Sequence, residues 1–316
     1  MKTILRTFVG CTAILFGTAC MGAVKYVPEN MKVELSLKVP GNNAVNYKLH
    51  PDKLENSYFD YEWRSDNKLP ITVFHKVEER DSCMRLTVQL TAAQDVYFNY
   101  RQLLSTGYRH DNCQFYMPGF WYRRNLRSPK KAPSFHTSDS WLVREDRLSA
   151  PLTGIFSEKE KRFMTVNRLD DFSMDALATH KEGEIILSGK TSLGFTGFEN
   201  QQGIAMLSFG FPYREAPKSY IRKLTLAPEV EAFQLMKKGE SVLLTWEIME
   251  SGADDFSDFI QHTWEHCYDT YAPKPVENSY SIADMKQVLS CFFVNSLVDN
   301  QPLVYNSGIH LKVSDC

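Results

Sequence analysis

The chain has 316 residues, of which 43% are hydrophobic and 23% are charged, proportions typical of a folded protein rather than a disordered one. Its 36 basic and 38 acidic residues give a formal net charge of −2, and no basic block occurs, so nucleic acid is not expected as a partner. Aromatic residues reach 13%, which fits both a thick sandwich core and a sugar-stacking surface.

The first 22 residues predict a bacterial export signal. Lys2 and Arg6 precede the apolar run Phe8–Phe16, which is too short to span a bilayer, and small residues follow it. We therefore expect a protein of the periplasm or the cell surface. Cleavage before Cys20 would leave a cysteine for lipidation, and this anchor is the only membrane attachment that we expect. Cleavage a few residues further on would release a soluble protein.

From about residue 24 to residue 250 the sequence predicts short β-strands without intervening helices. Met84–Leu90 alternates strictly between apolar and polar residues, as in a strand with one buried face, and Val242–Ile248 is more apolar. The expected fold class is therefore mainly β, a large antiparallel β-sandwich followed by the start of an α-helical domain. The other expected strands are Met31–Val39, Ile71–Val77, Val96–Tyr100, Phe163–Asn167, Glu184–Leu187, Ile204–Phe211 and Tyr220–Leu226.

The pattern becomes helical near residue 250. Asp254–Tyr271 carries apolar residues at three-to-four spacing and is followed by Pro273 and Pro275, so residues 251–275 are expected to form a helical linker. A second helix should begin at Ser281, within a segment 276–316 that would be the start of a helical domain.

Five cysteines lie after the leader, and their spacing does not match a zinc ribbon. In an oxidising compartment Cys83 could pair with Cys113, or Cys267 with Cys291. Buried free thiols are an equal alternative, and the sequence leaves both open.

The segment Met117–Ala150 is the candidate substrate-binding region. It combines tryptophans, which can stack on the C–H faces of sugars, with arginine, asparagine and aspartate side chains that can bind hydroxyl or carboxylate groups. The alternative is an aromatic-rich loop folded over the edge of the sandwich, with its Arg–Asp pairs merely solvated. The candidate substrate-binding residues are Trp121, Arg123, Arg124, Asn125, Trp141, Arg144, Asp146 and Arg147.

His262, Glu265 and His266 match the H-x-x-E-H pattern of an inverted zinc-protease motif. A third ligand would have to come from downstream, where Glu277 is the only later glutamate, and these residues fall on the polar face of the predicted helix. A solvated helix face explains them, so we expect neither a metal site nor a cofactor. No G-x-S-x-G elbow, Walker loop or G-x-G-x-x-G motif occurs, and no catalytic residue can be assigned.

The order of an export leader, a sheet-rich block and the hinge Trp264–Pro275 resembles the polysaccharide-degrading proteins of Bacteroidetes-type bacteria. In that family a β-supersandwich precedes an (α/α)-toroid with glycosidase or polysaccharide-lyase activity. The resemblance implies that this chain is a truncated N-terminal portion, because a toroid needs many more helices than the two expected here. Most catalytic residues would then lie beyond Cys316, and sandwich loops would complete the substrate site.

Two functions follow as hypotheses. The first is the β-sandwich part of a glycoside hydrolase or polysaccharide lyase, which contributes contacts to a poly- or oligosaccharide and, given the arginines, to an acidic one. The second is a non-catalytic glycan-binding lipoprotein of the cell envelope, in which the last 60 or so residues would form a helical cap.

Overall fold

The computed structural model describes residues 27–80, 83–125, 135–170, 183–220, 225–227, 229–274 and 280–295. The export signal, Cys20 and Cys316 lie outside these ranges. The chain divides into two compact units, residues 1–267 and 268–316. The first unit is built mainly of antiparallel strands, which confirms the predicted fold class.

Sheet A forms one layer of the sandwich and runs in the order β2–β1–β6–β14–β13–β9, all antiparallel. Its strands are β1 (Met31–Lys38), β2 (Val45–Lys53), β6 (Val96–Arg109), β9 (Ser140–Arg144), β13 (Phe195–Gln201) and β14 (Ile204–Phe211). β2 also belongs to the other layer, because Val45–Leu49 pair with β1 while His50–Lys53 pair with β3.

Sheet B forms the second layer and runs in the order β2–β3–β4–β5–β19–β11–β10–β7–β8, again antiparallel. Its other strands are β3 (Tyr61–Arg64), β4 (Ile71–Glu79), β5 (Cys83–Ala92), β7 (Cys113–Met117), β8 (Trp121–Arg123), β10 (Leu152–Ser157), β11 (Arg162–Arg168) and β19 (Ser241–Gly252). Short 3₁₀ helices lie at Pro28–Asn30 (η1), His110–Asn112 (η2) and Glu145–Arg147 (η3).

A smaller sheet lies beside sheet A. It joins β12 (Gly183–Ile186), β18 (Val230–Met236) and β15 (Arg214–Glu215), with β12 and β18 in parallel, and the end of β18 pairs with β6. The expected single strand Tyr220–Leu226 is wrong. Tyr220 and Leu226 instead belong to two different strands, because β16 (Lys218–Tyr220) pairs antiparallel with β17 (Thr225–Ala227).

The hydrophobic core lies between sheets A and B. In β5 the predicted alternation is confirmed, because Met84, Leu86, Val88 and Leu90 are buried in this core while the residues between them are partly exposed. Burial of each such side chain contributes roughly 1.5–3 kcal/mol. This core therefore fixes which face of every strand points outward, and the outward faces are where a binding site can form.

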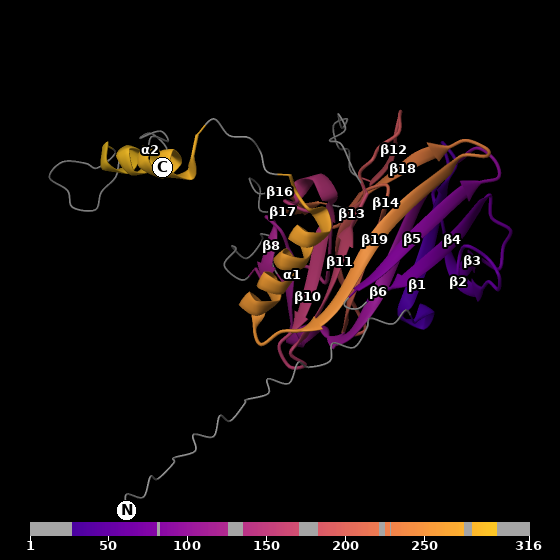
Figure 1. Ribbon diagram of the computed structural model, residues 1–316. Helices are drawn as coiled ribbons and strands as arrows, with labels where there is room; N and C mark the ends of the chain where they lie inside the picture. Colours follow the sequence, from indigo (N-terminus) through magenta and orange to yellow (C-terminus); the bar gives the residue numbers. More distant parts are fainter. Residues whose placement is uncertain are drawn as a thin grey trace, which may run out of the picture. The chain divides into compact units, whose positions relative to one another are not determined.

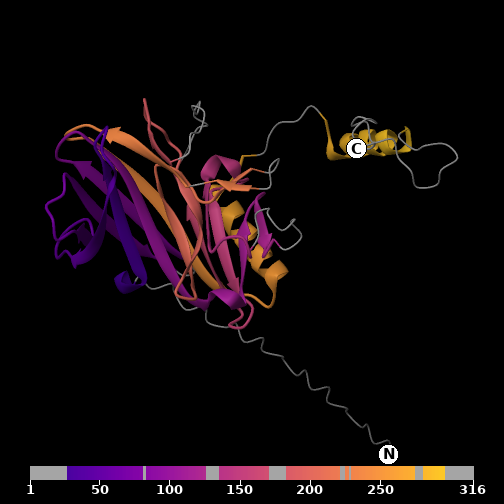
Figure 2. The same ribbon diagram turned by 180° about the vertical axis from the view of Figure 1, so that it is seen from behind.

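Helix α1 (Phe256–Tyr271) packs on the outer face of sheet B (Figures 1 and 2). Asp255 caps its start, since its Oδ1 accepts from the backbone N–H groups of Ser257 and Asp258 at 2.7 and 3.0 Å. The helix buries its apolar stripe against β7, β10, β11 and β19, and its residues up to Cys267 belong to the same compact unit as the sandwich. The cluster contains Phe256, Phe259, Cys267, Tyr116, Phe156, Phe163 and Met249.

Helix α2 (Ile282–Asn295) begins where the sequence predicted. Ser281 caps it reciprocally: the Ser281 hydroxyl donates to Asp284 at 2.6 Å and accepts from the Asp284 backbone N–H at 3.1 Å. Its apolar residues, including Val288 and Phe292, are exposed. Neither of the two described helices has the length and hydropathy that crossing a bilayer would require.

The cysteines within the described ranges are free thiols. Cys83, Cys113 and Cys267 are buried and Cys291 is exposed, so neither of the two candidate disulfides is formed. Cys83, Cys113 and Cys267 are therefore buried free thiols, which was the alternative to disulfide bonds.

Candidate functional site

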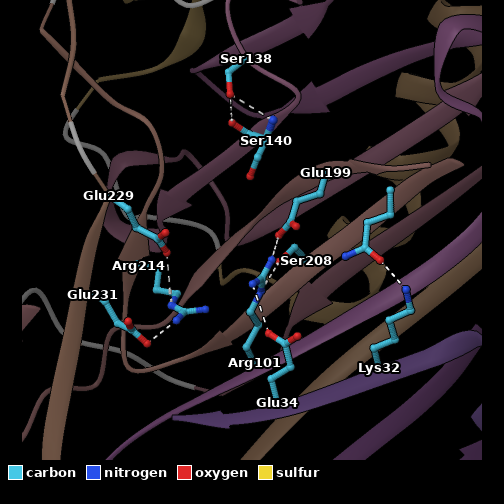
Figure 3. A network of polar contacts seen from close by, with 11 residues as sticks. Lys32, Glu34, Arg101, Ser138, Ser140, Glu199, Ser208, Arg214, Glu229 and Glu231 are labelled. Atoms are coloured by element: carbon cyan, nitrogen blue, oxygen red, sulfur yellow. Dashed lines mark hydrogen bonds and ion pairs between the residues drawn. The ribbon is translucent and has the colours of Figure 1, made fainter. Parts of the chain in front are cut away.

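The outer face of sheet A carries a cluster of charged side chains. Strand alternation turns Glu34, Arg101, Ser208 and Glu199 away from the core, and the register of β1, β6, β14 and β13 sets them side by side. Figure 3 shows these side chains pointing toward one another across the four strands.

Arg101 is the centre of this cluster. Its Nη1 lies 3.3 Å from Glu34, its Nε donates to the Ser208 hydroxyl at 3.3 Å, and its Nη2 contacts Glu199. Only 17% of the Arg101 side chain is exposed. Burial alone would lower the pKa of the guanidinium, but Glu199 and Glu34 outweigh burial and raise it. Arg101 is therefore a fixed cation whose orientation is set by three strands.

A second arginine lies beside it. Arg214 of β15 contacts Glu231 of β18, its register partner, and its Nε lies 3.5 Å from Glu229 (Figure 3). Partial burial raises the pKa of Glu229, and the carboxylates of Glu231 and Glu199 act in the same direction, whereas the two arginines oppose them. Because 48% of the Glu229 side chain is exposed, water screens part of this effect.

We name the residues of both arginine groups the sheet A cluster. Its members are Glu34, Arg101, Glu199, Ser208, Arg214, Glu229 and Glu231. Lys32 and Gln201 lie at its border, where the lysine Nζ donates to the amide oxygen at 2.5 Å. The cluster offers fixed N–H donors and carboxylate acceptors on one face, together with a half-exposed carboxyl group that holds its proton to a higher pH than usual.

The structure buries both tryptophans of the predicted loop site. Trp121 and Trp141 are 0% and 1% exposed, and their rings pack against each other with centroids 4.9 Å apart. Their indole N–H groups donate to the backbone carbonyls of Arg123 and Ser138 at 3.0 and 3.1 Å. Neither ring face reaches the surface, so in this structure the two tryptophans pack in the core and do not offer a stacking surface to a sugar.

The arginines after Trp121 remain close together in β8 and the turn that follows. Arg123 is exposed and lies over the ring of Phe256, while Arg124 donates to the carbonyls of Cys113, at 3.2 Å, and Asp111. Asn125 has a positive φ of 52°, and its N–H donates to the Tyr122 carbonyl at 3.1 Å. Most of these polar groups thus stabilise the edge of sheet B.

The residues after Trp141 form a separate group at β9 and η3. Arg144 binds Asp146 through two N–H groups at 2.5 and 3.0 Å and lies over the ring of Tyr213. Arg147 donates to Glu215 at 3.1 Å. These guanidinium groups already have carboxylate partners, so they are poorly suited to capture an anionic sugar. The contact that joins the two halves of the predicted site is the packing of Trp121 on Trp141.

No member of the sheet A cluster is among the substrate-binding residues predicted from the sequence. A signal was present, since Arg101 follows Phe98 and Tyr100 in its strand and Glu199 directly follows Phe198. A charge at such a position requires a partner. The pairing of strands that are far apart in sequence supplies it, and this pairing is not visible in the sequence.

Comparison with known proteins finds matches among solved structures alone. No protein-family model matches the chain, and no curated protein matches it in sequence. Among solved structures, a polysaccharide lyase aligns at 14% identity and a TM-score of 0.34 over 74% of this chain, which spans only 27% of the lyase chain. An aldose 1-epimerase candidate from Klebsiella pneumoniae aligns at 9% identity and a TM-score of 0.34, covering 76% of this chain and 62% of its own.

An alpha-galactosidase from Lactobacillus brevis aligns at 8% identity and a TM-score of 0.26, over 71% of this chain and 29% of the galactosidase chain. All three TM-scores are below 0.5. These similarities therefore assign neither a family nor an activity to this chain.

Proposed function

We propose that the sheet A cluster binds a saccharide, and that the chain is the β-sandwich part of a protein that processes carbohydrates outside the cytoplasm. The observation that carries this proposal is the gathering of Arg101 and Arg214 with four carboxylates on one outer face of the sandwich.

Saccharides present many hydroxyl groups, each of which both donates and accepts hydrogen bonds. A site for them needs fixed donors and fixed acceptors at short range, and paired guanidinium and carboxylate groups supply both. Because Arg101 is held by Glu34, Glu199 and Ser208, it loses little conformational freedom when a ligand binds. This preorganisation favours recognition of a polar ligand.

The charge of the cluster favours a neutral saccharide. Its four glutamates outnumber Arg101 and Arg214, and Lys32 at the border does not restore the balance. The acidic sugar expected from the sequence depended on arginines that have protein partners here: Arg124, Arg144 and Arg147 contact carbonyl or carboxylate oxygens, and Arg123 lies over the ring of Phe256. A neutral poly- or oligosaccharide is the better match.

Glu229 is the member best suited to proton transfer. A carboxyl group with a raised pKa retains a proton that it can donate to a leaving oxygen, as the general acid of a glycosidase does. In this proposal the sandwich contributes substrate contacts to a glycoside hydrolase or a polysaccharide lyase. The N-terminal leader pattern supports export, and Cys20 supports lipid anchoring at the cell surface as part of the same proposal.

A non-catalytic glycan-binding envelope protein is the second candidate. It is favoured by α1, whose apolar stripe is buried on sheet B in the manner of a cap that completes the sandwich. Incubation with the bound oligosaccharide, followed by chromatography, tests this second candidate: shortened or unsaturated products would show an enzyme and would exclude a non-catalytic binder.

The test is a screen of the protein against neutral and acidic oligosaccharides, followed by calorimetric titration of the best ligand. We expect Arg101→Met to weaken binding at least about tenfold, since it removes charged hydrogen bonds. Arg64→Met is the matched control, because Arg64 is an exposed guanidinium of β3 that pairs with Asp52 and Glu62.

Glu229→Gln is a second variant that preserves shape and tests the cluster if Arg101→Met does not fold. It should also weaken binding. Wild-type protein that binds no oligosaccharide in the screen, or folded Arg101→Met and Glu229→Gln proteins that bind as tightly as wild type, would overturn the proposal.

A further inference from the structure

Another polar cluster lies on the other layer of the sandwich, between the outer face of sheet B and α1. Cys83 at the start of β5, Glu247 in β19 and His266 in α1 place one sulfur, one carboxylate oxygen and one ring nitrogen within 4.8 Å of one another. The pairing of β5 with β19 and the packing of α1 on sheet B hold these three residues together.

The cluster is mostly removed from water. Cys83 and Glu247 are buried, and His266 is half-buried. The His266 Nε2 lies 2.7 Å from one oxygen of Glu247, and the Arg85 guanidinium lies 3.8 Å from the other. Burying a carboxylate is costly unless its charge is compensated at short range. A cation bound among the three donor atoms would compensate this charge directly.

The donor set matches the preferences of a particular metal. Thiolate, imidazole and carboxylate are the three protein ligand types of Zn²⁺, and a site with three protein ligands keeps its fourth position for water or substrate. We propose that Cys83, Glu247 and His266 form a Zn²⁺ site with an open fourth position. This inference does not depend on the saccharide proposal, because it concerns the other layer of the sandwich.

His266 also lines a groove of about 650 Å³ beside α1, and this groove gives the open position a route to solvent. Other residues that line the groove include Lys161, Asp258, His262 and Glu265. Burial and the Glu247 carboxylate raise the pKa of the Cys83 thiol to about 11, so the metal-free site holds a thiol. Binding of Zn²⁺ would release this proton to solvent and leave a thiolate on the metal.

This site differs from the helical motif considered in the sequence. His262 lies 3.5 Å from Asp258, and Glu265 accepts from Gln261 at 2.8 Å, so both are engaged along the helix. His266 instead meets ligands from two strands of sheet B. No metal site was expected because only the helix and the chain after it were considered as sources of ligands, whereas Cys83 precedes His266 by more than 180 residues.

The test is a titration of the full chain, purified with chelator and reductant, with Co²⁺ as a spectroscopic probe for zinc. We expect one equivalent to bind with a thiolate-to-cobalt charge-transfer band in the near ultraviolet, and Zn²⁺ to displace it. Cys83→Ser should abolish the band, and His266→Ala should weaken Co²⁺ binding at least about tenfold.

Two cysteine variants serve as controls and should keep the band. Cys113→Ser removes a buried thiol that lies in the core between sheets A and B and donates to the Arg109 carbonyl at 3.2 Å. Cys291→Ser removes the exposed thiol of α2. If Cys83→Ser fails to fold, His266→Ala decides, since His266 lies half-buried on the helix. Absence of the band in wild-type protein, or an unchanged titration in folded Cys83→Ser or His266→Ala, would overturn the proposal.

Discussion

Phe259 of α1 lies directly over Gly154 of β10, and this contact sets how closely the helix approaches sheet B. A Cβ atom added to Gly154 would lie 2.5 Å from Phe259 Cζ, closer than packed atoms allow, and 3.1 Å from Thr165 Cγ2. The glycine is therefore required for the close packing of helix and sheet. The same packing brings His266 to Glu247.

Gly154→Ala should destabilise the protein by about 1–3 kcal/mol, because the ring of Phe259 would have to move out of a packed cluster. Gly189→Ala is the control: its Cβ would meet no atom within 4 Å, and a change within about 0.5 kcal/mol is expected. Urea unfolding monitored by fluorescence gives both free energies. Equal stabilities for the two variants would show that α1 does not depend on this contact.

Trp121→Ala should lower the free energy of unfolding far more than a surface substitution does. The side chain is fully buried against Trp141 and Phe198, and truncation of such a residue costs about 3–5 kcal/mol. Tyr122→Ala, which removes a neighbouring exposed aromatic ring, is expected to cost about 1 kcal/mol or less. A stable Trp121→Ala protein that has lost only saccharide binding would restore the stacking role predicted from the sequence.

Acid should weaken the fold through His75. This side chain is buried in the core with its Nε2 2.7 Å from the Tyr100 hydroxyl, and burial lowers its pKa from 6.5 to about 3. The folded pKa is the lower one, so the stability due to neutral His75 is complete above pH 6.5 and is lost as the pH falls toward 3. At pH 4.5 the loss should be about 2–3 kcal/mol.

Urea unfolding at pH 7 and pH 4.5 tests this, with His75→Gln as the comparison. Other groups change protonation in the same range, among them His110, whose pKa burial also lowers, but they are common to both proteins. The variant should lose less stability between the two pH values than wild type does. Identical losses would mean that His75 is protonated in the folded state without cost.

Two elements with one buried face could be predicted from the spacing of their apolar residues. The stripe of Phe256, Phe259 and Thr263 and the alternation in β5 each gave the correct element and the correct core face. β10, in contrast, is buried on both sides by the sandwich core and by α1, so Leu152–Ser157 shows no alternation and was not predicted. A strand covered on both faces has no period-2 signal.

The candidate site could not be predicted for a related reason. Trp121 and Trp141 lie near several arginines in one segment of the sequence. This combination of aromatic and charged residues favoured a binding site at the surface. Whether a tryptophan packs in a core or faces a ligand depends on strand pairing at the sheet edges. Arg101 and Glu199 are separated by 98 residues and meet only because β14 lies between their strands.

The most direct measurement is the crystal structure of the protein with the oligosaccharide that the screen selects. We predict that the sugar lies on the outer face of sheet A, with its hydroxyl groups within hydrogen-bond distance of Arg101 and of a carboxylate such as Glu34 or Glu229. A sugar bound instead at the groove beside α1, or at the edge formed by Arg123 and Arg124, would contradict the assignment of the sheet A cluster as the binding site.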